Sequence, residues 1–249
     1  MRDSHMAVTG GGSGLGAAVA RHLAAQGARV TVIDRNAEAA VQVAEAVGGL
    51  ALALDVTDAG AGEALDRAIA AQGALWGLVN CAGIGGAARI LGREGPMEME
   101  AFDRVIRVNL LGTFNMLRLA AARMQGNDAI EGERGSIVNT ASVAAFDGQL
   151  GQAAYAASKG GIVSLALPAA RELARFGIRV NTVAPGLFLT PLLAELPAEV
   201  QQGLAAAIPF PPRLGDPGEF AEAVAFCLTN RYLNAEVIRL DGGLRLPLR

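Results

Sequence analysis

The sequence predicts an α/β protein with a doubly wound parallel sheet of about seven strands and helices on both faces. First, short apolar or β-branched segments alternate with longer segments of helical periodicity, which is typical of a parallel sheet covered on both sides. Second, a glycine-rich turn at residues 9–16 follows the first strand segment. Third, polar residues such as Asp34 and Asp55 stand at strand ends, where open α/β sheets bind ligands. These features favour a Rossmann-type arrangement.

The first part of the chain alternates strand and helix three times. Its strands are short apolar or β-branched runs, and its helices carry apolar residues at three- and four-residue spacing. The polar residues 2–5 should leave the first strand short, with a frayed edge, and Asn36 is a possible helix N-cap. In order, we expect a strand at 6–8, a helix at 14–26, a strand at 30–33, a helix at 36–47, a buried strand at 50–54 and a helix at 60–72.

The same alternation continues with longer helices and longer loops. Glycines and polar residues mark the loops, and the segment 187–216, rich in Pro and Leu, is the least regular. In order, we expect a strand at 75–80, a loop at 84–96, a long helix at 98–124, a surface loop at 127–135, a strand at 136–140, a long helix at 152–176, a strand at 178–184, a helix near 217–230 and a last strand at 236–240.

Composition excludes several classes of function. The net charge of −3 and pI near 5.5 argue against a nucleic-acid surface. The apolar stretch 180–194 contains prolines and is too short to enter a membrane as a span. Cys81 and Cys227 lie far apart with no signal peptide ahead of the glycine-rich turn, which predicts a cytoplasmic protein without disulfides. The two histidines, His5 and His22, show no zinc-site spacing, so we expect no metal.

The turn at residues 9–16, TGGGSGLG, is suited to a pyrophosphate. Glycines let the backbone approach the phosphates, and the following helix N-terminus offers free N–H groups, although glycines also simply make turns. Asp34 ends the second strand. A carboxylate there can accept both hydroxyls of an adenosine ribose and repels a 2′-phosphate, which favours NAD. The adjacent Arg35 leaves pairing with a phosphate open.

Further candidates follow the third and fourth strands. Asp55 and Val56 stand where an adenine ring would lie, while Asp55 also suits a helix cap or a loop. Asn80, Cys81, Ala82 and Gly83 follow the fourth strand in sequence. All of them lie at carboxyl ends of strands, so we expect them to converge on one dinucleotide.

Tyr155 and Lys159 are spaced to share one face of a helix. A phenol with a pKa of about 10 is a weak base at neutral pH, and a nearby ammonium lowers that pKa. Lys159 is the only lysine among 21 lysine and arginine residues. A compact ammonium that also reaches a ribose hydroxyl explains its retention better than chance does.

Ser142 and Asn109 are further candidates with alternatives. Ser142 follows the strand at 136–140 and could bind the substrate oxygen on which Tyr155 acts, or serve as a turn or cap residue. Asn109 interrupts an apolar pattern in the long helix and needs a partner. It either holds a water chain to Lys159 or bonds to backbone.

Taken together, these motifs resemble the short-chain dehydrogenases/reductases. The segments 139–162, 184–197, 209–217 and 236–245 are similar to the type II 3-hydroxyacyl-CoA dehydrogenases, and the likeness covers residues 6–247. The wider superfamily usually has a second asparagine where this chain has Cys81, while the closer group shares the cysteine.

The resemblance implies roles for individual residues. Tyr155 is the general acid/base, Ser142 orients the substrate oxygen, Lys159 lowers the tyrosine pKa and holds the nicotinamide ribose, and Asn109 completes the tetrad. Gln149 lies near the substrate with Ser142 and Tyr155. The implied cofactor-binding set is Gly10, Ser13, Leu15, Gly16, Asp34, Asp55, Val56, Asn80, Cys81, Ala82, Gly83, Tyr155, Lys159, Pro185, Gly186, Phe188 and Thr190.

The resemblance and the motifs lead to one functional hypothesis. We expect residues 1–249 to form a single dinucleotide-binding catalytic domain that oxidises 3-hydroxyacyl-CoA to 3-oxoacyl-CoA reversibly, with NAD, in fatty acid metabolism. The loop at about 187–216 would cover the acyl chain, or simply pack on the core. The family usually forms homotetramers through its two long helices and last strand, so we expect the same here, with a small-molecule acyl-CoA substrate.

Three alternatives stay open. The enzyme could reduce an acyl-carrier-protein thioester, although such reductases usually use NADPH and Asp34 disfavours it. It could oxidise a hydroxysteroid or another secondary alcohol. A dinucleotide-binding sensor or scaffold without turnover is the non-enzyme alternative, which the presence of both Tyr155 and Lys159 disfavours.

Overall fold

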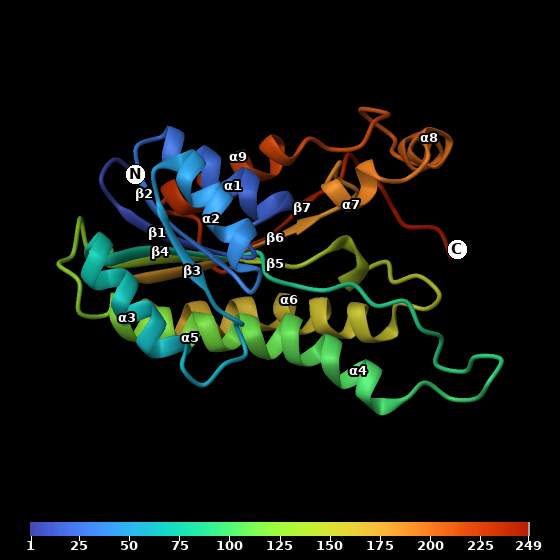
Figure 1. Ribbon diagram of the computed structural model, residues 1–249, viewed down its shortest axis with the longest axis horizontal. Coiled ribbons are helices and arrows are strands. Elements are labelled where there is room, and N and C mark those ends of the chain that lie inside the picture. Colours follow the sequence, from blue (N-terminus) through green and yellow to red (C-terminus); the bar gives the residue numbers. More distant parts are fainter. Residues whose placement is uncertain (249) are drawn as a thin grey trace.

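A seven-stranded parallel sheet in the order β3-β2-β1-β4-β5-β6-β7 forms the centre of the molecule, which confirms the predicted fold class (Figure 1). The computed structural model describes residues 1–248. The chain order reverses between β1 and β4, and open α/β sheets bind ligands at such a switch point. The strands are β1 (His5–Thr9), β2 (Arg29–Asp34), β3 (Leu50–Ala53), β4 (Leu75–Asn80), β5 (Gly135–Thr140), β6 (Ile178–Pro185) and β7 (Val237–Leu240).

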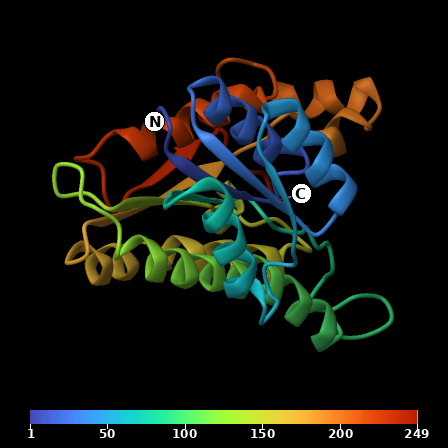
Figure 2. The same ribbon diagram turned by 60° about the vertical axis from the view of Figure 1, so that its left-hand side comes forward.

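Helices form a layer on each face of the sheet (Figures 1 and 2). One face carries α1 (Gly14–Ala25), α2 (Ala37–Val47) and α9 (Pro217–Thr229). The other carries α3 (Ala61–Gln72), α4 (Met99–Ile106), α5 (Gly112–Met124) and α6 (Ala153–Ala174). Asn36 caps α2 as predicted, because its side chain accepts a hydrogen bond from the Ala39 amide.

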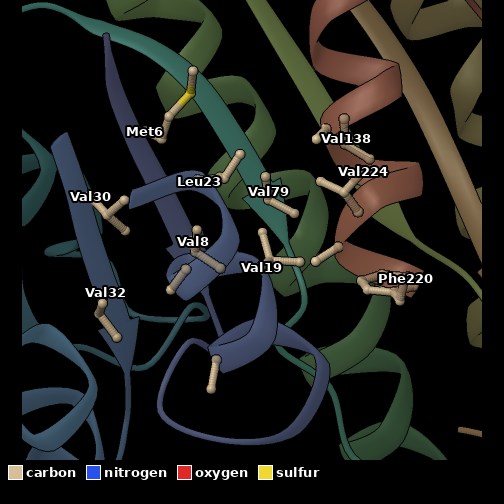
Figure 3. Close-up of a cluster of buried hydrophobic side chains, with 14 of the residues drawn as sticks. Met6, Val8, Val19, Leu23, Val30, Val32, Val79, Val138, Phe220 and Val224 are labelled. Atoms are coloured by element: carbon tan, nitrogen blue, oxygen red, sulfur yellow. The ribbon is translucent and has the colours of Figure 1, made fainter. Parts of the chain in front are cut away.

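Apolar side chains of the central strands and of α1 and α9 interlock on the first face (Figure 3). Each is at most 1% exposed, and burial of such a side chain stabilises the fold by roughly 1.5–3 kcal/mol. The cluster fixes α1, whose first turn faces the carboxyl end of β1. Its labelled members are Met6, Val8, Val19, Leu23, Val30, Val32, Val79, Val138, Phe220 and Val224.

The first strand is longer than expected, and its edge is not frayed. β1 begins at His5, which is 1% exposed. The His5 Nδ1 lies 2.8 Å from the carbonyl oxygen of Gly73, and Nε2 lies 2.8 Å from Thr31 Oγ1. A carbonyl can only accept, so Nδ1 carries the proton and Nε2 accepts from the threonine. A polar residue can begin a buried strand here because both ring nitrogens are satisfied.

Two other segments differ from expectation. β3 is half-buried rather than buried, because it is the edge strand and pairs with β2 alone. The segment 187–216, expected to be irregular, contains two short helices, α7 (Pro191–Ala194) and α8 (Ala198–Ala206). The side chain of Leu192 and residue 249 lie outside the described part of the chain.

The long helix expected at 98–124 is interrupted. A π-helical turn, η1 (Arg107–Leu111), separates α4 from α5 and carries Asn109. Next to it, Gly112 packs so close to Val56 that a Cβ there would lie 2.5 Å from a valine methyl. Apolar spacing continues through this stretch, so the sequence could not reveal the bulge. Such π-bulges occur often at functional sites.

Three further properties concern the described residues. Within 1–248, no helix has the length and apolar character that a membrane span requires. In the same part of the chain, histidine, cysteine and acidic residues form no cluster suited to a metal ion. Cys81 and Cys227 are both free thiols.

Candidate active site

A cavity of about 450 Å³ opens at the carboxyl ends of the strands around the switch point. Its walls come from the glycine-rich turn and from the segments that follow β2, β3 and β4. Sequence reasoning predicted most of this lining for a cofactor. The predicted residues in the lining are Gly10, Ser13, Leu15, Gly16, Asp34, Asp55, Val56, Cys81, Ala82 and Gly83.

Two glycines are required by the shape of the turn. Gly10 has φ +62°, and a Cβ there would lie 2.7 Å from the Ala82 backbone nitrogen. A Cβ on Gly16 would collide with the Gly10 carbonyl oxygen. Ser13 is the N-cap of α1 and makes no side-chain cap bond. The first amides of α1 are therefore available at the cavity, with the positive end of the helix dipole behind them.

Asp34 is fixed at the cavity wall by backbone amides. Its Oδ2 accepts from Gly12 at 3.1 Å, and its Oδ1 accepts from Asn36 at 2.9 Å. Each carboxylate oxygen can accept more than one hydrogen bond, so Asp34 retains acceptor capacity for a ligand hydroxyl. Arg35 also lines the cavity, which places a guanidinium near the position of a 2′-substituent.

Asp55 lines the cavity and also stabilises the loop in which it lies. It lines the cavity, and its Oδ1 accepts from the Thr57 amide at 2.9 Å and the Thr57 hydroxyl at 2.7 Å. These bonds hold the pKa of the Asp55 carboxyl below its usual value. Beside it, the Val56 carbonyl accepts from Asn115 at 2.8 Å, which fixes this wall against α5.

Asn80 lies beneath the cavity rather than in its lining. It is 2% exposed, and its amide donates to Asn139 Oδ1 at 3.0 Å and to the Thr113 carbonyl at 3.4 Å. The hydroxyl of Thr9 donates to its Oδ1 at 3.4 Å and accepts from the Ala82 amide at 3.2 Å. These bonds join the ends of β1, β4 and β5, so the Asn80 side chain supports the residues that face the cavity.

The structure brings Ser142, Tyr155 and Lys159 together where β5 ends and α6 begins. Ser142 caps the short helix η2 (Val143–Ala145), where its Oγ accepts from Ala144 at 3.1 Å. Its hydroxyl is also near enough to the Tyr155 phenol to lower the pKa of that group. The Lys159 ammonium lies 5.8 Å from the centre of the Tyr155 ring and donates to the Thr140 carbonyl at 2.8 Å.

Burial dominates the electrostatics of this pair. It raises the pKa of the Tyr155 phenol, and the neighbouring Ser142 hydroxyl opposes that rise. Burial lowers the pKa of Lys159 to about 8. We expected Lys159 to lower the tyrosine pKa; in the structure the pKa of Tyr155 is raised, and the opposing influence comes from Ser142. Both groups are removed from water, which disfavours both charged forms.

Asn109 is fully buried and uses its side chain on two partners. Its Nδ2 donates to the Ile84 carbonyl at 2.9 Å and to Ser158 Oγ at 3.0 Å, and its Oδ1 accepts from the Ile84 amide at 2.8 Å. Of the two roles that the sequence left open for Asn109, its side chain therefore shows bonding to the backbone. Asn109 connects the π-turn, the segment after β4 and α6, and a Cβ on the intervening Gly83 would lie 3.6 Å from Lys159 Nζ.

Sequence reasoning missed two residues of this cluster, Thr140 and Ser158. The Thr140 carbonyl is the acceptor for Lys159, and its hydroxyl donates to Cys81 Sγ at 3.4 Å. Ser158 accepts from Asn109 and donates to the Tyr155 carbonyl at 2.7 Å. Serine and threonine are common in strands and helices, so nothing local distinguished these two. Burial raises the pKa of the Cys81 thiol to about 11, which keeps it protonated.

Gln149 lies at a second cavity of about 450 Å³ beside the start of α6. Its wall is formed by the segment 148–153, by Ala156 and by Arg89, Ile90 and Leu91 from the loop after β4. Gln149 donates through Nε2 to the Pro247 carbonyl at 3.1 Å. The residue predicted to face substrate is thus also held by the C-terminal segment.

The predicted residues after β6 lie at different depths. Pro185 is buried at the end of β6, and Gly186 packs against Asp241. Phe188 is 5% exposed, and its ring meets Phe220 edge-to-face at 6.0 Å, so its side chain belongs to the core rather than to the nucleotide cavity. Thr190 reaches the glycine-rich turn, with its methyl group 3.7 Å from a Cβ position on Gly14.

Comparison with known proteins gives consistent matches. A family model described as short chain dehydrogenase matches residues 4–201. A 3-hydroxyacyl-CoA dehydrogenase type-2 from Bos taurus is 50% identical over 245 residues, 96% of this chain and 94% of that protein. A (3R)-3-hydroxyacyl-CoA dehydrogenase from Homo sapiens is 36% identical over 260 residues, 98% of this chain and 96% of that protein. The crystal structure of 3-hydroxyacyl-CoA dehydrogenase type-2 from Mycobacterium avium superposes with a TM-score of 0.92 at 42% identity, covering 99% of this chain and 97% of that one.

Proposed function

Because the chain belongs to the short-chain dehydrogenase family, a family of oxidoreductases, we propose that it oxidises a 3-hydroxyacyl-CoA to the 3-oxoacyl-CoA reversibly, with NAD as the cofactor. The observation that carries this proposal is the cluster of Ser142, Tyr155 and Lys159 beside a cavity whose wall holds Asp34. The type-2 relatives supply the substrate class through their names.

The residues around the first cavity fit a dinucleotide. Gly10 and Gly16 leave space that a Cβ would fill, and the amides of α1 provide donors for a pyrophosphate. Asp34 would accept the hydroxyls of the adenosine ribose, and the side of the cavity at Asp55 and Val56 would border the adenine. Bound there, the nicotinamide ring supplies the hydride-transfer chemistry.

The protein's own part in the reaction is the movement of one proton. In the oxidative direction the Tyr155 phenolate takes the proton of the substrate hydroxyl, while Ser142 donates a hydrogen bond to the same oxygen. Burial of Tyr155 opposes phenolate formation, so a positive charge must compensate. Lys159 would supply this charge, because it lies near the Tyr155 phenol at the same end of α6. Its ammonium is held there by the Thr140 carbonyl.

The substrate would occupy the second cavity, next to Gln149. This cavity adjoins the start of α6, and Ile90 and Leu91, each 73% exposed, offer apolar surface at its rim. Loop 187–216, with α7 and α8, would cover the acyl chain from the other side, so that residues 1–249 act as one catalytic domain. Arg89 lies in the same wall and suits an anionic part of the substrate.

The assembly and setting belong to the same proposal. A groove of about 320 Å³ between α5 and α6 is lined by Phe114, Leu165 and Phe176 among others, and a homotetramer would cover it. The free thiols Cys81 and Cys227 suit the reducing cytoplasm. The proposed reaction places the enzyme in fatty acid metabolism.

A panel of 3-oxoacyl-CoA thioesters with NADH and NADPH tests the proposal. We expect oxidation of NADH, followed by its absorbance, with acetoacetyl-CoA and longer thioesters, and much slower reaction with NADPH. Faster turnover of the acyl-carrier-protein thioester with NADPH would favour the reductase alternative, for which Arg35 at the cavity is the supporting feature. Turnover of hydroxysteroids alone, or of nothing, would favour the remaining alternatives.

A further inference from the structure

Arg239, at the edge strand β7, connects segments that are distant in sequence. Its guanidinium donates to both carboxylate oxygens of Asp147, at 3.4 Å to Oδ1 and 2.6 Å to Oδ2. It also donates to Asp241 Oδ2 at 2.9 Å and to the Leu244 carbonyl at 3.1 Å. The group lies over the Phe146 ring, 5.0 Å from its centre. A planar fork that contacts two carboxylates and a ring at once cannot be replaced by lysine.

This network is largely shielded from water. The side chains of Arg239, Asp147 and Asp241 are 22%, 18% and 8% exposed. A charge-assisted, two-pronged pair in such a place is stronger and better defined than a pair on the open surface. The hydrogen bond and charge of Arg239, with smaller contributions from the charge of Arg245 and from the Leu246 amide, hold the pKa of Asp147 below its usual range. Asp147 is therefore charged at neutral pH.

Asp147 lies in the segment between Ser142 and α6, and this segment is held on its other side by the C-terminal residues. Gln149 Nε2 donates to the Pro247 carbonyl at 3.1 Å, and the Leu150 amide donates to the Leu248 carbonyl at 3.3 Å. In Figure 1 the red C-terminal segment descends toward the yellow-green segment that follows β5. Arg239 thus ties both the loop 146–152 and the tail 244–248 to the sheet.

The loop that Arg239 restrains forms the wall of the second cavity. Residues 148–152 line that cavity, whereas neither Asp147 nor Arg239 is among the described residues that line the nucleotide cavity. A change in this network should consequently affect the binding of the acyl-CoA substrate more than the binding of the dinucleotide.

We propose that Arg239 is a positioning residue for the acyl-CoA substrate, because with Asp147 it holds the loop 146–152, whose residues 148–152 form one wall of the substrate cavity. The inference rests on the proposed function for the identity of the substrate. Arg239 contacts neither substrate nor cofactor in this role; it acts through Gln149 and Leu150.

Steady-state kinetics with acetoacetyl-CoA and NADH on the purified full-length enzyme test the proposal. Asp147→Asn keeps the shape of the side chain and removes its charge, and Arg239→Met removes the guanidinium. We expect either change to raise KM for acetoacetyl-CoA about tenfold and to change kcat less than about threefold, with the Kd of NADH unaltered. Asp147→Glu should recover part of the loss, and the double variant should be no worse than Arg239→Met, since the two side chains act as a unit.

A matched control is Arg245→Met. Arg245 pairs with Asp241 in the same network at 3.2 Å, but its side chain is 63% exposed, and it acts on Asp147 through its charge without a hydrogen bond. We expect its KM to equal that of the wild type. Asp147→Asn remains informative if Arg239→Met does not fold.

Hydrogen exchange of the amides in 146–152 separates positioning from general support. Faster exchange there together with a raised KM supports the proposal. Faster exchange with an unchanged KM, or an equal loss of NADH and substrate affinity, overturns it. Absence of turnover by the wild-type enzyme with every 3-oxoacyl-CoA is a different result, because it rejects the proposed function itself.

Discussion

Both ends of the sheet bury ionisable side chains, but they satisfy them differently. At the amino-terminal end, Arg179 of β6 is 7% exposed and donates to Glu133 at 2.8 Å. It also donates to the carbonyls of Cys227 and Leu228, both at 2.7 Å, where α9 ends. Burial raises the pKa of Glu133, and the charge and hydrogen bond of Arg179 oppose that rise. The other carboxylate oxygen of Glu133 makes no hydrogen bond within residues 1–248, but Arg231 Nε lies 3.4 Å from it, so each of these buried charges faces an opposite charge.

At the carboxyl-terminal end of the sheet, the largely buried groups of Tyr155 and Lys159 have no opposite charge beside them and few hydrogen-bond partners in the part of the chain that the structure describes. Lys159 is 5% exposed, and among the described residues only the Thr140 carbonyl accepts a hydrogen bond from its ammonium. Its pKa is lowered to about 8, and the pKa of Tyr155 is raised. Buried groups that lack full pairing are costly unless a ligand completes them, and such groups concentrate at functional sites. Under the proposed function, this difference corresponds to one end of the sheet that serves stability and another that serves chemistry.

The largest expected effect comes from removing the phenol at the reactive end. Tyr155→Phe should lower kcat about a thousandfold, since general acid/base catalysis contributes 10²–10⁴-fold, with NADH affinity and unfolding free energy nearly unchanged. Steady-state rates and NADH fluorescence titration measure this. Tyr232→Phe is the control, because Tyr232 is the other tyrosine and fully exposed. If the Tyr155→Phe enzyme kept a rate near that of the wild type, the carboxyl-terminal end of the sheet would not have the catalytic role that distinguishes it from the amino-terminal end.

The next effect concerns the paired end. Glu133→Gln leaves the buried Arg179 without a counter-charge and should lower the free energy of unfolding by about 3 kcal/mol, as when one partner of a buried pair is lost. Denaturant unfolding measures it. Asp66→Asn, which breaks an exposed pair with Arg123, should cost at most about 1 kcal/mol. Activity per folded molecule should stay at the wild-type level; a loss comparable to that of Tyr155→Phe would show that this end also serves catalysis.

A smaller effect is expected from Asp34, at the nucleotide side of the reactive end. Asp34→Ala removes the carboxylate that repels a 2′-phosphate and leaves Arg35 in the cavity wall. The ratio of kcat/KM for NADH over NADPH should fall at least about tenfold, which corresponds to roughly 1.4 kcal/mol. An unchanged ratio would mean that another residue selects the cofactor.

The smallest effect is a pH dependence at the amino-terminal end. Burial is the main cause that lowers the pKa of His5 from 6.5. Below pH 6.5, His5 therefore binds a proton in the unfolded chain but not in the folded protein. The free energy of unfolding consequently falls as the pH drops from 6.5 toward the folded pKa of His5, by at most about 1.4 kcal/mol per pH unit. Unfolding free energies at pH 7.5 and 5.5, for the wild type and for His5→Gln, measure this. Equal pH dependence of both proteins would argue against it.

Sequence patterns were sufficient where a structure depends on neighbouring residues. The strand at 75–80 has the predicted bounds, Asn36 caps α2, and the glycine-rich turn lies between β1 and α1. The sequence pattern was insufficient where contacts with side chains distant in sequence determine the local structure. The polar His5 argued for a frayed edge, yet it begins a buried strand, and apolar spacing over 98–124 gave no sign of the π-turn at Asn109.

The sequence by itself determined the alternation of strands and helices, the turn that can approach a phosphate and the helical spacing of Tyr155 and Lys159, because φ preferences and side-chain periodicity are local properties of the chain. Only the tertiary structure decided which buried polar groups find partners. His5 meets Gly73 across 68 positions, and Asp147 meets Arg239 across 92. Such pairings follow from how the sheet is ordered and its faces covered, and their hydrogen bonds and pKa shifts follow from burial, which no single segment specifies.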